Sequence, residues 1–169
     1  MGSPPDARVE FCEREYPRLV GGLTLYTSDR ELSRELAQEA LARACQHWGR
    51  VRRMDAPGAW VWRVALNLAN RSFARRRAQR RAEHALGQER VATPGDPDEA
   101  VAVRAAVVAL PKRQRVALVL RYFADLPVRE VARLMRCREG TVKALTHQGI
   151  ANLRQTLMLE QLEEALDGN

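Results

Sequence analysis

Apolar residues recur at helical spacing along most of the chain, and this periodicity predicts an all-α protein. The first helical segment runs from about Ala7 to Leu25. A bend is expected at Pro17, because proline removes a backbone donor inside a helix. In the second segment apolar residues recur at helical spacing from Leu32 to Trp48, opposite a polar face. The chain is therefore predicted to start with two long amphipathic helices.

The residues that flank the next segments predict where the helices begin. Ser28 and Glu31 fit a capping box, in which each side chain accepts a hydrogen bond from the other residue's free backbone amide. The third helix is predicted to begin near Asp55, with Pro57 in its first turn, where no amide donor is needed. Its apolar stripe is expected at Trp60, Val64, Ala65 and Leu68.

The C-terminal half is predicted to hold four helices separated by proline-containing breaks. The first begins at Asp96-Pro97, with acidic residues beside the positive end of the helix dipole, and Leu110-Pro111 ends it. The second ends before residues 125–127. A short helix over about residues 128–134 follows, and a longer last helix begins near Arg138.

A cluster of breaker residues divides the chain in the middle. Residues 92–97 combine proline, glycine and aspartate with little apolar content, so we predict a flexible linker at 87–96. The linker separates a first domain at 1–86 from a second at 97–169. Fully extended, the chain from Ala82 to Asp96 would span about 45–50 Å, at roughly 3.3 Å per residue. The expected architecture is thus two small helical domains that can lie apart.

The net charge of the chain indicates what kind of partner it binds. Lys and Arg number 28 against 21 for Asp and Glu, which gives a formal net charge of +7. A basic excess of this size favours a polyanionic partner such as nucleic acid, although a soluble basic protein without such a partner remains an alternative. Six arginines follow the apolar stripe of the third predicted helix within residues 71–81. A nucleic-acid backbone would relieve their mutual repulsion and release counterions, whereas a solvated helix end is the alternative.

Other chemistry is not indicated. The three cysteines, Cys12, Cys45 and Cys137, are odd in number and far apart in sequence, so neither a disulfide framework nor a metal site is expected. We find no nucleophile elbow, phosphate-binding glycine loop or metal-ligand set, and we expect neither an enzyme nor a cofactor. The sequence has no signal-peptide pattern and no window of membrane-span length, which predicts a cytoplasmic protein with reduced thiols and no direct membrane contact.

The most specific pattern lies in the C-terminal half. Residues 128–134 predict a short helix, residues 135–137 a tight turn, and residues 138–143 the start of the next helix. This is the anatomy of a helix-turn-helix, whose second helix fits the DNA major groove. Val131 and Val142 can pack inward, while Thr141, Lys143 and His147 project from the front of the second helix. An ordinary helical hairpin in a bundle is the alternative.

These segments together resemble a known family. The stretch from Leu110-Pro-Lys-Arg-Gln-Arg through Arg129-Glu-Val-Ala-Arg-Leu to Glu139-Gly-Thr-Val-Lys resembles region 4 of extracytoplasmic-function sigma factors of the sigma-70 family. Glu35-Leu-Ala-Gln-Glu-Ala-Leu and Trp60-Val-Trp-Arg-Val-Ala-Leu-Asn67 resemble the polymerase-binding and −10 helices of their region 2. Two matches in the right order are more specific than either alone. The resemblance implies a transcription initiation factor that brings core RNA polymerase to promoters.

The resemblance also implies roles for residues at matching positions. Residues expected to contact the β′ clamp helices of the polymerase lie on the polar face of the second helix: Glu35, Gln38, Glu39 and Arg43. Residues expected at the −10 element, where a non-template base is flipped into a pocket, are Arg52, Arg53, Met54, Asp55, Asn67, Asn70, Arg71, Arg75 and Arg76. Residues expected at the −35 element are Arg138, Glu139, Thr141, Val142, Lys143, Thr146 and His147.

Two further partners follow from the resemblance, together with one expected departure. Region 4 is expected to contact the β flap of the polymerase, and an anti-sigma factor is expected to mask the DNA and polymerase faces. Arg136 and Arg138 stand where the family often has glycine and serine, and Gln148 stands where a basic residue is frequent. Weaker or unusual −35 recognition is therefore expected.

Two rival hypotheses stay open on the sequence. The chain could be an autonomous helix-turn-helix regulator whose N-terminal half senses a ligand or dimerises. It could also be a sigma-like protein that binds polymerase without reading DNA. An autonomous dimeric regulator should bind a palindrome alone, whereas a sigma factor should bind promoters well only with polymerase.

Overall fold

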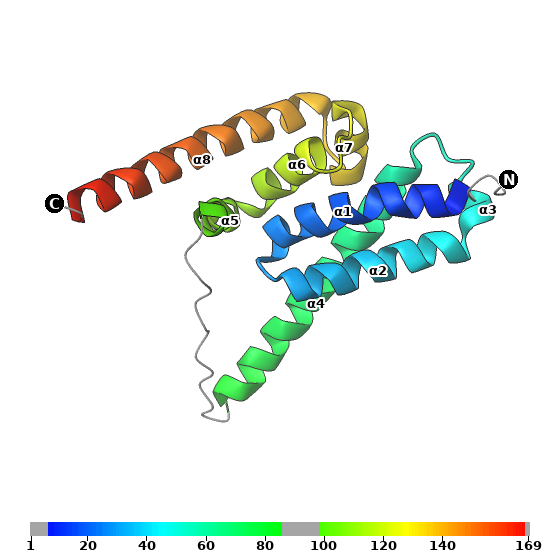
Figure 1. The fold of residues 1–169 in the computed structure, drawn as a ribbon, viewed down its shortest axis with the longest axis horizontal. Coiled ribbons are helices and arrows are strands. Elements are labelled where there is room, and N and C mark those ends of the chain that lie inside the picture. Colours follow the sequence, from blue (N-terminus) through cyan, green and yellow to red (C-terminus); the bar gives the residue numbers. More distant parts are fainter. Residues whose placement is uncertain (1–6, 86–98, 168–169) are drawn as a thin grey trace, which may run out of the picture.

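The computed structural model describes residues 7–85 and 99–167, and within these ranges the chain forms eight helices and no strand. The first four are α1 (Ala7–Thr27), α2 (Arg30–Gln46), α3 (Trp48–Val51) and α4 (Pro57–Ala85). The other four are α5 (Glu99–Ala109), α6 (Lys112–Tyr122), α7 (Val128–Met135) and α8 (Glu139–Asp167) (Figure 1). The all-α prediction is confirmed, whereas the predicted linker at 87–96 and the helix start at Asp96-Pro97 lie outside the described residues.

Helices α1 and α2 lie side by side, and both pack on α4 (Figure 1). Their core is built from side chains spaced one helical turn apart, including Leu19 and Leu23 of α1 and Leu36 and Ala40 of α2. The indole of Trp62 on α4 is fully buried among them. Among the described helices, none has both the length and the apolar character that a membrane crossing requires.

The predicted apolar stripe of α4 is only partly right. Trp60, Val64 and Leu68 are half-buried, whereas the fully buried positions include Val61, Trp62 and Ala69. Ala65 alone of the predicted stripe is fully buried. The reason is that α1, α2 and α7 all contact α4, so its buried face is wide and is turned by about one residue from the expected centre.

The start and end of α2 also differ from the prediction. The residue that caps α2 is Asp29, whose carboxylate accepts a hydrogen bond from the Leu32 amide at 2.9 Å. Ser28 instead adopts a left-handed conformation with φ of 58°, which turns the chain between α1 and α2. At its other end α2 stops at Gln46, and the short helix α3 carries Trp48 separately. Trp48 packs on Phe11 of α1, with ring centroids 5.3 Å apart.

The two halves of the chain share one hydrophobic core. Val119 and Leu120 of α6 are buried in the same cluster as Leu19 and Leu23 of α1. Gly22 lies at the junction, because a Cβ atom there would come within 2.5 Å of the Trp62 ring and 2.9 Å of Phe123 Cβ. The close approach of α1 to both α4 and α6 therefore needs a residue without a side chain at this position.

An arginine fastens the same junction by hydrogen bonds. The guanidinium of Arg115 on α6 donates to the carbonyl oxygens of Tyr26 and Leu110, each at 3.2 Å, and also to that of Val108. It lies 5.8 Å from the centroid of the Tyr26 ring. One half-buried side chain thus satisfies carbonyl groups at the ends of α1 and α5 together.

Candidate nucleic-acid interface

Helices α7 and α8 form the helix-turn-helix that the sequence predicts. Arg136 ends α7 in a left-handed conformation with φ of 50° and ψ of 51°. The Cys137 amide then donates to the Ala132 carbonyl at 3.0 Å, and the Arg138 carbonyl accepts from the Thr141 amide at 3.0 Å. Val131 of α7 and Val142 of α8 are fully buried between the helices. This packing fixes the angle at which the front of α8 is presented.

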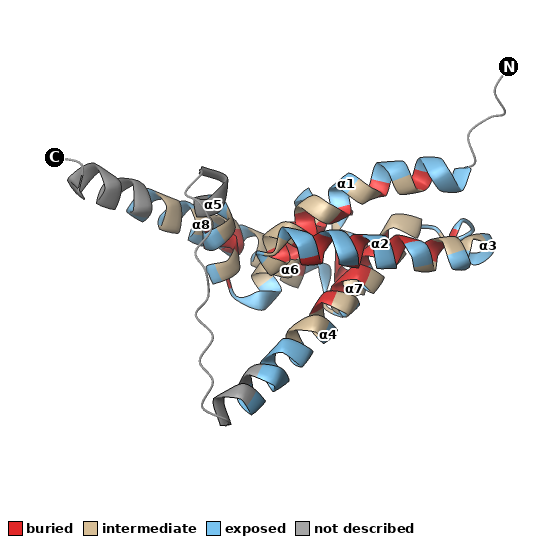
Figure 2. Cartoon of the chain, turned by 60° about the horizontal axis from the view of Figure 1, so that its bottom comes forward, coloured by how far each residue is buried: buried red, intermediate tan, exposed pale blue. Residues whose placement is uncertain are grey.

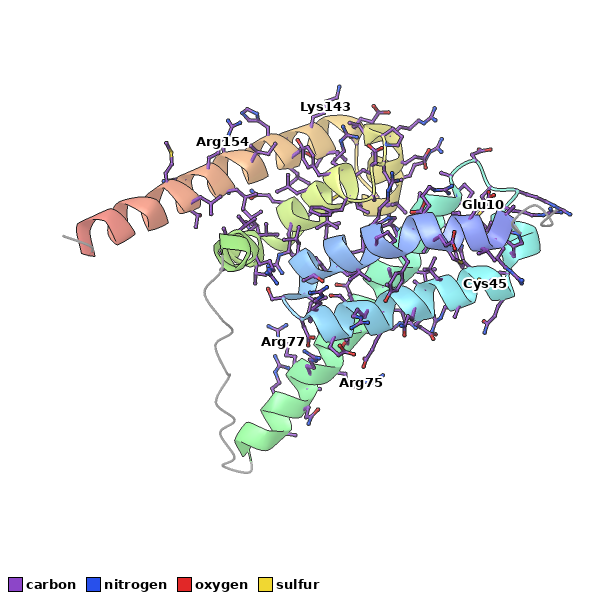
Figure 3. The ribbon with its side chains drawn as sticks, in the orientation of Figure 1. Glu10, Cys45, Arg75, Arg77, Lys143 and Arg154 are labelled. Atoms are coloured by element: carbon purple, nitrogen blue, oxygen red, sulfur yellow. The ribbon has the colours of Figure 1, made fainter. Side chains whose placement is uncertain are left out.

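Four of the seven residues of the predicted −35 set are exposed at the start and on the front of α8. Lys143 and His147 are exposed one helical turn apart, and Lys143 points away from the body of the molecule (Figure 3). Arg138 and Glu139 are exposed just before and at the start of α8. The start of α8 therefore presents charged and polar side chains to solvent.

Three other residues of that set are less available than expected. Val142 has no exposed surface, so its place in the predicted DNA-contacting set is wrong, since it packs in the core. Thr146 is half-buried, and its hydroxyl donates to the Val142 carbonyl at 2.8 Å. Thr141 is half-buried as well. The sequence showed the positions on the helix but could not show how deeply α8 sits against α7 and α6.

The basic part of α4 projects from the body of the molecule. In Figure 2 the ribbon of α4 is mostly pale blue, the colour of exposed residues, from residue 74 to residue 79. Arg71, Arg75, Arg76 and Arg77 are all exposed there, and Arg75 and Arg77 stand out from the helix (Figure 3). Asn67 is exposed one helical turn before Arg71. The exposed amide of Asn67 can form hydrogen bonds with bases. The guanidinium groups that follow it can neutralise phosphates.

Two predicted −10 residues are already engaged within the protein. Asn70 is half-buried, and its amide oxygen accepts a hydrogen bond from the Tyr26 hydroxyl at 2.9 Å. This contact joins α4 to α1, so the amide oxygen of Asn70 is already engaged within the protein. Arg76 forms an ion pair with Asp29 at 3.0 Å, although it is exposed.

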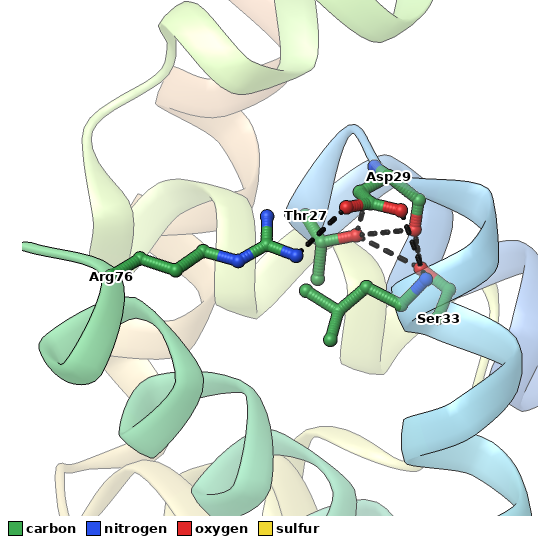
Figure 4. A network of polar contacts seen from close by, with 5 residues as sticks. Thr27, Asp29, Ser33 and Arg76 are labelled. Atoms are coloured by element: carbon green, nitrogen blue, oxygen red, sulfur yellow. Dashed lines mark hydrogen bonds and ion pairs between the residues drawn. The ribbon is translucent and has the colours of Figure 1, made fainter. Parts of the chain in front are cut away.

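The ion pair of Arg76 belongs to a polar network at the start of α2 (Figure 4). The Thr27 hydroxyl donates to the Asp29 carbonyl at 3.0 Å, and the buried Ser33 hydroxyl donates to the same carbonyl at 2.6 Å. The Leu32 amide, and to a smaller extent Arg76, lower the pKa of the Asp29 carboxyl below its ordinary value, while burial opposes them. The network fixes α4 to the turn that precedes α2.

The loop that precedes α4 presents the rest of the predicted −10 set. Arg52, Arg53 and Asp55 are exposed, and Met54 is half-buried. The Met54 amide donates to the Val51 carbonyl at 3.1 Å, which holds the loop against α3. Asn67 lies ten residues beyond Pro57 on α4, about 15 Å along the helix axis. The loop and Asn67 could thus contact one melted strand at separate nucleotides.

The predicted polymerase-binding residues do share one face of α2. Glu35, Gln38 and Glu39 are exposed, and Arg43 is half-buried. Glu39 accepts a hydrogen bond from Arg43 at 2.7 Å along this face. The opposite face, with Leu36 and Ala40, is buried against α1 and α4. The helix is therefore held on one side and open to a partner on the other.

A cationic cavity between the two halves was not predicted from the sequence. It has a volume of about 500 Å³ and is lined by Tyr26, Thr27, Phe73, Arg76, Arg77, Lys112 and Arg115. The cations come from α4 and α6, which are far apart in sequence. Only the approach of the two halves brings them together, so no local pattern could have indicated this cavity.

Comparisons with known proteins match both halves of the chain. Residues 11–81 match the model of Sigma-70 region 2, and residues 100–153 match that of Sigma-70 region 4. The chain is 29% identical over 133 residues to an RNA polymerase sigma-E factor of Streptomyces antibioticus, across 78% of this chain and 73% of that protein. It is 28% identical over 142 residues to an RNA polymerase sigma-H factor of Pseudomonas aeruginosa, across 75% and 74% of the two chains.

A solved structure shares the fold. The sigma factor RpoE from Bartonella quintana, determined in complex with the anti-sigma factor NepR, superposes with a TM-score of 0.69 at 18% sequence identity. The match covers 89% of this chain and 96% of that one. The arrangement of both halves is therefore an arrangement seen in a solved protein.

Proposed function

This chain belongs to the sigma-70 family and, with region 2 followed directly by region 4, to its extracytoplasmic-function type; we propose that it binds core RNA polymerase and directs transcription initiation at specific promoters. The observation that carries the proposal is the order of the two regions over residues 11–81 and 100–153. The exposed basic surface of α4 and the exposed polar front of α8 support it, because each lies in one of the two matched regions.

Region 2 reads the −10 element in this proposal. Arg52, Arg53 and Asp55 of the loop and Asn67 of α4 contact the melted strand, whose flipped base offers its hydrogen-bonding edge. Arg71 and Arg75 neutralise backbone phosphates next to it, which supplies affinity without sequence information. Arg76 can join them when its ion pair with Asp29 opens.

Region 4 reads the −35 element. The front of α8 enters the major groove, so that Lys143 and His147 reach bases or phosphates and Arg138 fixes the register. Glu139 can accept a hydrogen bond from a cytosine amine. Because the exposed front of α8 has few cations, we expect modest affinity for the −35 element.

In this proposal the polymerase catalyses RNA synthesis, and the chain selects the promoter at which synthesis starts. The exposed face of α2 with Glu35, Gln38 and Glu39 docks on the β′ clamp, and region 4 contacts the β flap. The chain then acts in the cytoplasm without an enzymatic reaction or cofactor of its own. An anti-sigma factor is a further proposed partner, since the fold relative from Bartonella quintana was determined with one.

The polymerase contact can be tested with a pair of charge reversals. Glu35→Lys changes an exposed carboxylate on the proposed contact face, and Glu13→Lys makes the same change on an exposed position of α1. Affinity for fluorescently labelled core polymerase should fall at least several-fold for the first variant and stay near wild type for the second. Equal affinities for both variants and the wild type would show that the α2 face is not the docking surface.

The rival functions predict other outcomes. An autonomous regulator would bind a palindromic site tightly without polymerase. A sigma-like protein without DNA readout would bind core polymerase, yet substitution of Asn67 or Lys143 would leave promoter use unchanged.

A further inference from the structure

Two thiols that are distant in sequence meet between α1 and α2. Cys12 lies on α1 and Cys45 on α2, 33 residues later, and their sulfur atoms are 3.5 Å apart. Both residues are half-buried, so small solutes can reach them. Cys137 is also half-buried, but it belongs to the turn between α7 and α8 in the other half of the chain.

The setting of the pair favours a covalent bond. A disulfide needs a separation of about 2.05 Å, which side-chain rotation can reach from sulfur atoms already in contact. Phe11, which precedes Cys12 on α1, packs on Trp48 at the start of α3, with ring centroids 5.3 Å apart. This contact ties the start of α1 to the segment that follows α2.

We propose that Cys12 and Cys45 form a dithiol that hydroperoxides oxidise to an intramolecular disulfide. With hydrogen peroxide, the Cys45 sulfur attacks one peroxide oxygen, an S–O bond forms and the O–O bond breaks. The departing hydroxide takes up the proton of the Cys45 thiol and leaves as water; an alkyl hydroperoxide would release an alcohol instead. The Cys12 sulfur then attacks the sulfenic sulfur of Cys45. The S–S bond forms, the S–O bond breaks, and a second water leaves with the Cys12 proton. The thiols lose two electrons, and the peroxide gains them.

The order of these steps follows from the surroundings of Cys12. Burial, together with the contact to Cys45, raises the pKa of the Cys12 thiol to about 11, so this thiol stays protonated at neutral pH. The sulfur of Cys45 lies 3.5 Å away, and either thiol can donate in the contact between them. A sulfenic acid at Cys45 would touch its partner thiol at once, which favours disulfide formation over further oxidation.

The bond would fasten the start of α1 to the end of α2. It closes a loop between residues 33 positions apart, which restricts the unfolded chain and raises the unfolding temperature by roughly 5–15 °C. Thiol reductants would reduce the bond again and return both cysteines to the free thiols seen in this structure. This proposal does not depend on the function in transcription.

Peptide mapping of the wild-type chain tests the proposal. The reduced full-length protein is treated with a small excess of hydrogen peroxide, blocked with N-ethylmaleimide, and digested with trypsin. We expect the peptide of residues 9–14, which contains Cys12, to be linked to the peptide of residues 44–50, which contains Cys45. Cys137 should carry one maleimide, and dithiothreitol should release the link and reverse the rise in unfolding temperature.

Cysteine variants provide the matched controls. Cys137→Ser should form the link as fully as the wild type, and Cys45→Ser should not form it. Full maleimide labelling of Cys12 and Cys45 after peroxide treatment would overturn the proposal. Oxidation of Cys45 to sulfinic acid with Cys12 still free, or a dimer linked through Cys137, would overturn it too.

Discussion

Gly22 lies where α1 packs closely against both α4 and α6. The nearest atoms to a Cβ built at this position would be the Trp62 ring at 2.5 Å, Phe123 Cβ at 2.9 Å and Val119 Cγ1 at 3.1 Å. Trp62 and Val119 are almost completely buried, so neither can turn away into solvent. Its neighbour Gly21 is different, because a Cβ there would meet Phe123 only at ordinary contact distances of 3.6 and 3.7 Å.

We therefore predict opposite outcomes for two adjacent alanine substitutions. Gly22→Ala should lower the free energy of unfolding by about 1–3 kcal/mol, because the added methyl group overpacks the junction. Gly21→Ala should leave stability unchanged or raise it by about 0.5–1 kcal/mol, since alanine favours the helix. Urea denaturation followed by circular dichroism measures both. Equal stabilities for the two variants would mean that the junction is looser than the structure shows.

Asp29 is the second position where one residue controls local structure. It caps α2 by accepting from the Leu32 amide, and it also pairs with Arg76 of α4. Asp29→Ala should cost about 1 kcal/mol, the usual value for a lost N-cap. Ser28→Ala should cost much less, because Ser28 is not the cap. If instead Ser28→Ala proved the more damaging change, the capping box predicted from the sequence would be correct.

The lowered pKa of Asp29 predicts that the folded chain loses stability at acidic pH. Since its pKa is lower in the folded chain than the ordinary value of 3.8, its contribution is fully present above that value and is lost as pH falls through the lowered pKa. Asp29→Asn keeps an acceptor oxygen but cannot titrate, so its stability should decline less on acidification. Urea midpoints measured across this acid range compare the two chains. Parallel declines would exclude a role for the Asp29 carboxylate.

At the scale of elements, helix α8 serves both the core and the proposed DNA surface. On its buried side, Val142 packs in the core, and Gly149 lies so close to α6 that an added Cβ atom would be 3.0 Å from Leu118. Its exposed side carries Lys143 near the start and Arg154 further along (Figure 3). The two cations are eleven residues apart, which corresponds to about 16 Å along the helix.

This separation allows a charge-matched test of the recognition helix. Lys143→Ala should weaken binding of the polymerase complex to a promoter with an intact −35 element by roughly 1–3 kcal/mol. Arg154→Ala removes the same charge far from the groove and should have little effect. Electrophoretic mobility shifts at fixed salt compare them. An equal loss in both variants would indicate general electrostatic attraction instead of contact by the start of α8.

For the whole molecule, the central feature is the contact between region 2 and region 4. Arg115 fastens it by satisfying carbonyl groups of Tyr26, Val108 and Leu110. Burial lowers the pKa of the Arg115 guanidinium, but the group keeps its charge at any physiological pH. One charged side chain of α6 thus hydrogen-bonds to the end of α1 in the first half and to the end of α5 in the second half.

Removal of this guanidinium should destabilise the junction. Arg115→Met leaves the carbonyl groups of Tyr26, Val108 and Leu110 without this donor, which should lower the free energy of unfolding by about 1–3 kcal/mol. Arg113→Met removes the same charge from a neighbouring exposed position and should be nearly neutral. Urea unfolding measures both variants. A neutral Arg115→Met would show that apolar packing alone holds the two halves together.

The sequence predicted most of the helices but few of the contacts between them. Helical periodicity and proline breaks located the helices well, since these are local properties. The widened buried face of α4, the contact of Asn70 with Tyr26 and the burial of Val142 depend on how helices pack. The same holds for the cavity between α4 and α6. Such features join residues far apart in sequence, and no spacing pattern encodes them.

Run-off transcription with purified core polymerase tests the central claim most directly. With the wild-type chain, bacterial genomic promoter fragments should give discrete new transcripts that core polymerase alone does not make. Asn67→Ala should abolish them, whereas Gln155→Ala, which truncates an exposed amide on α8, should preserve them. No new transcript and no binding to core polymerase, alongside tight binding of the chain alone to a palindromic DNA site, would contradict the sigma-factor account.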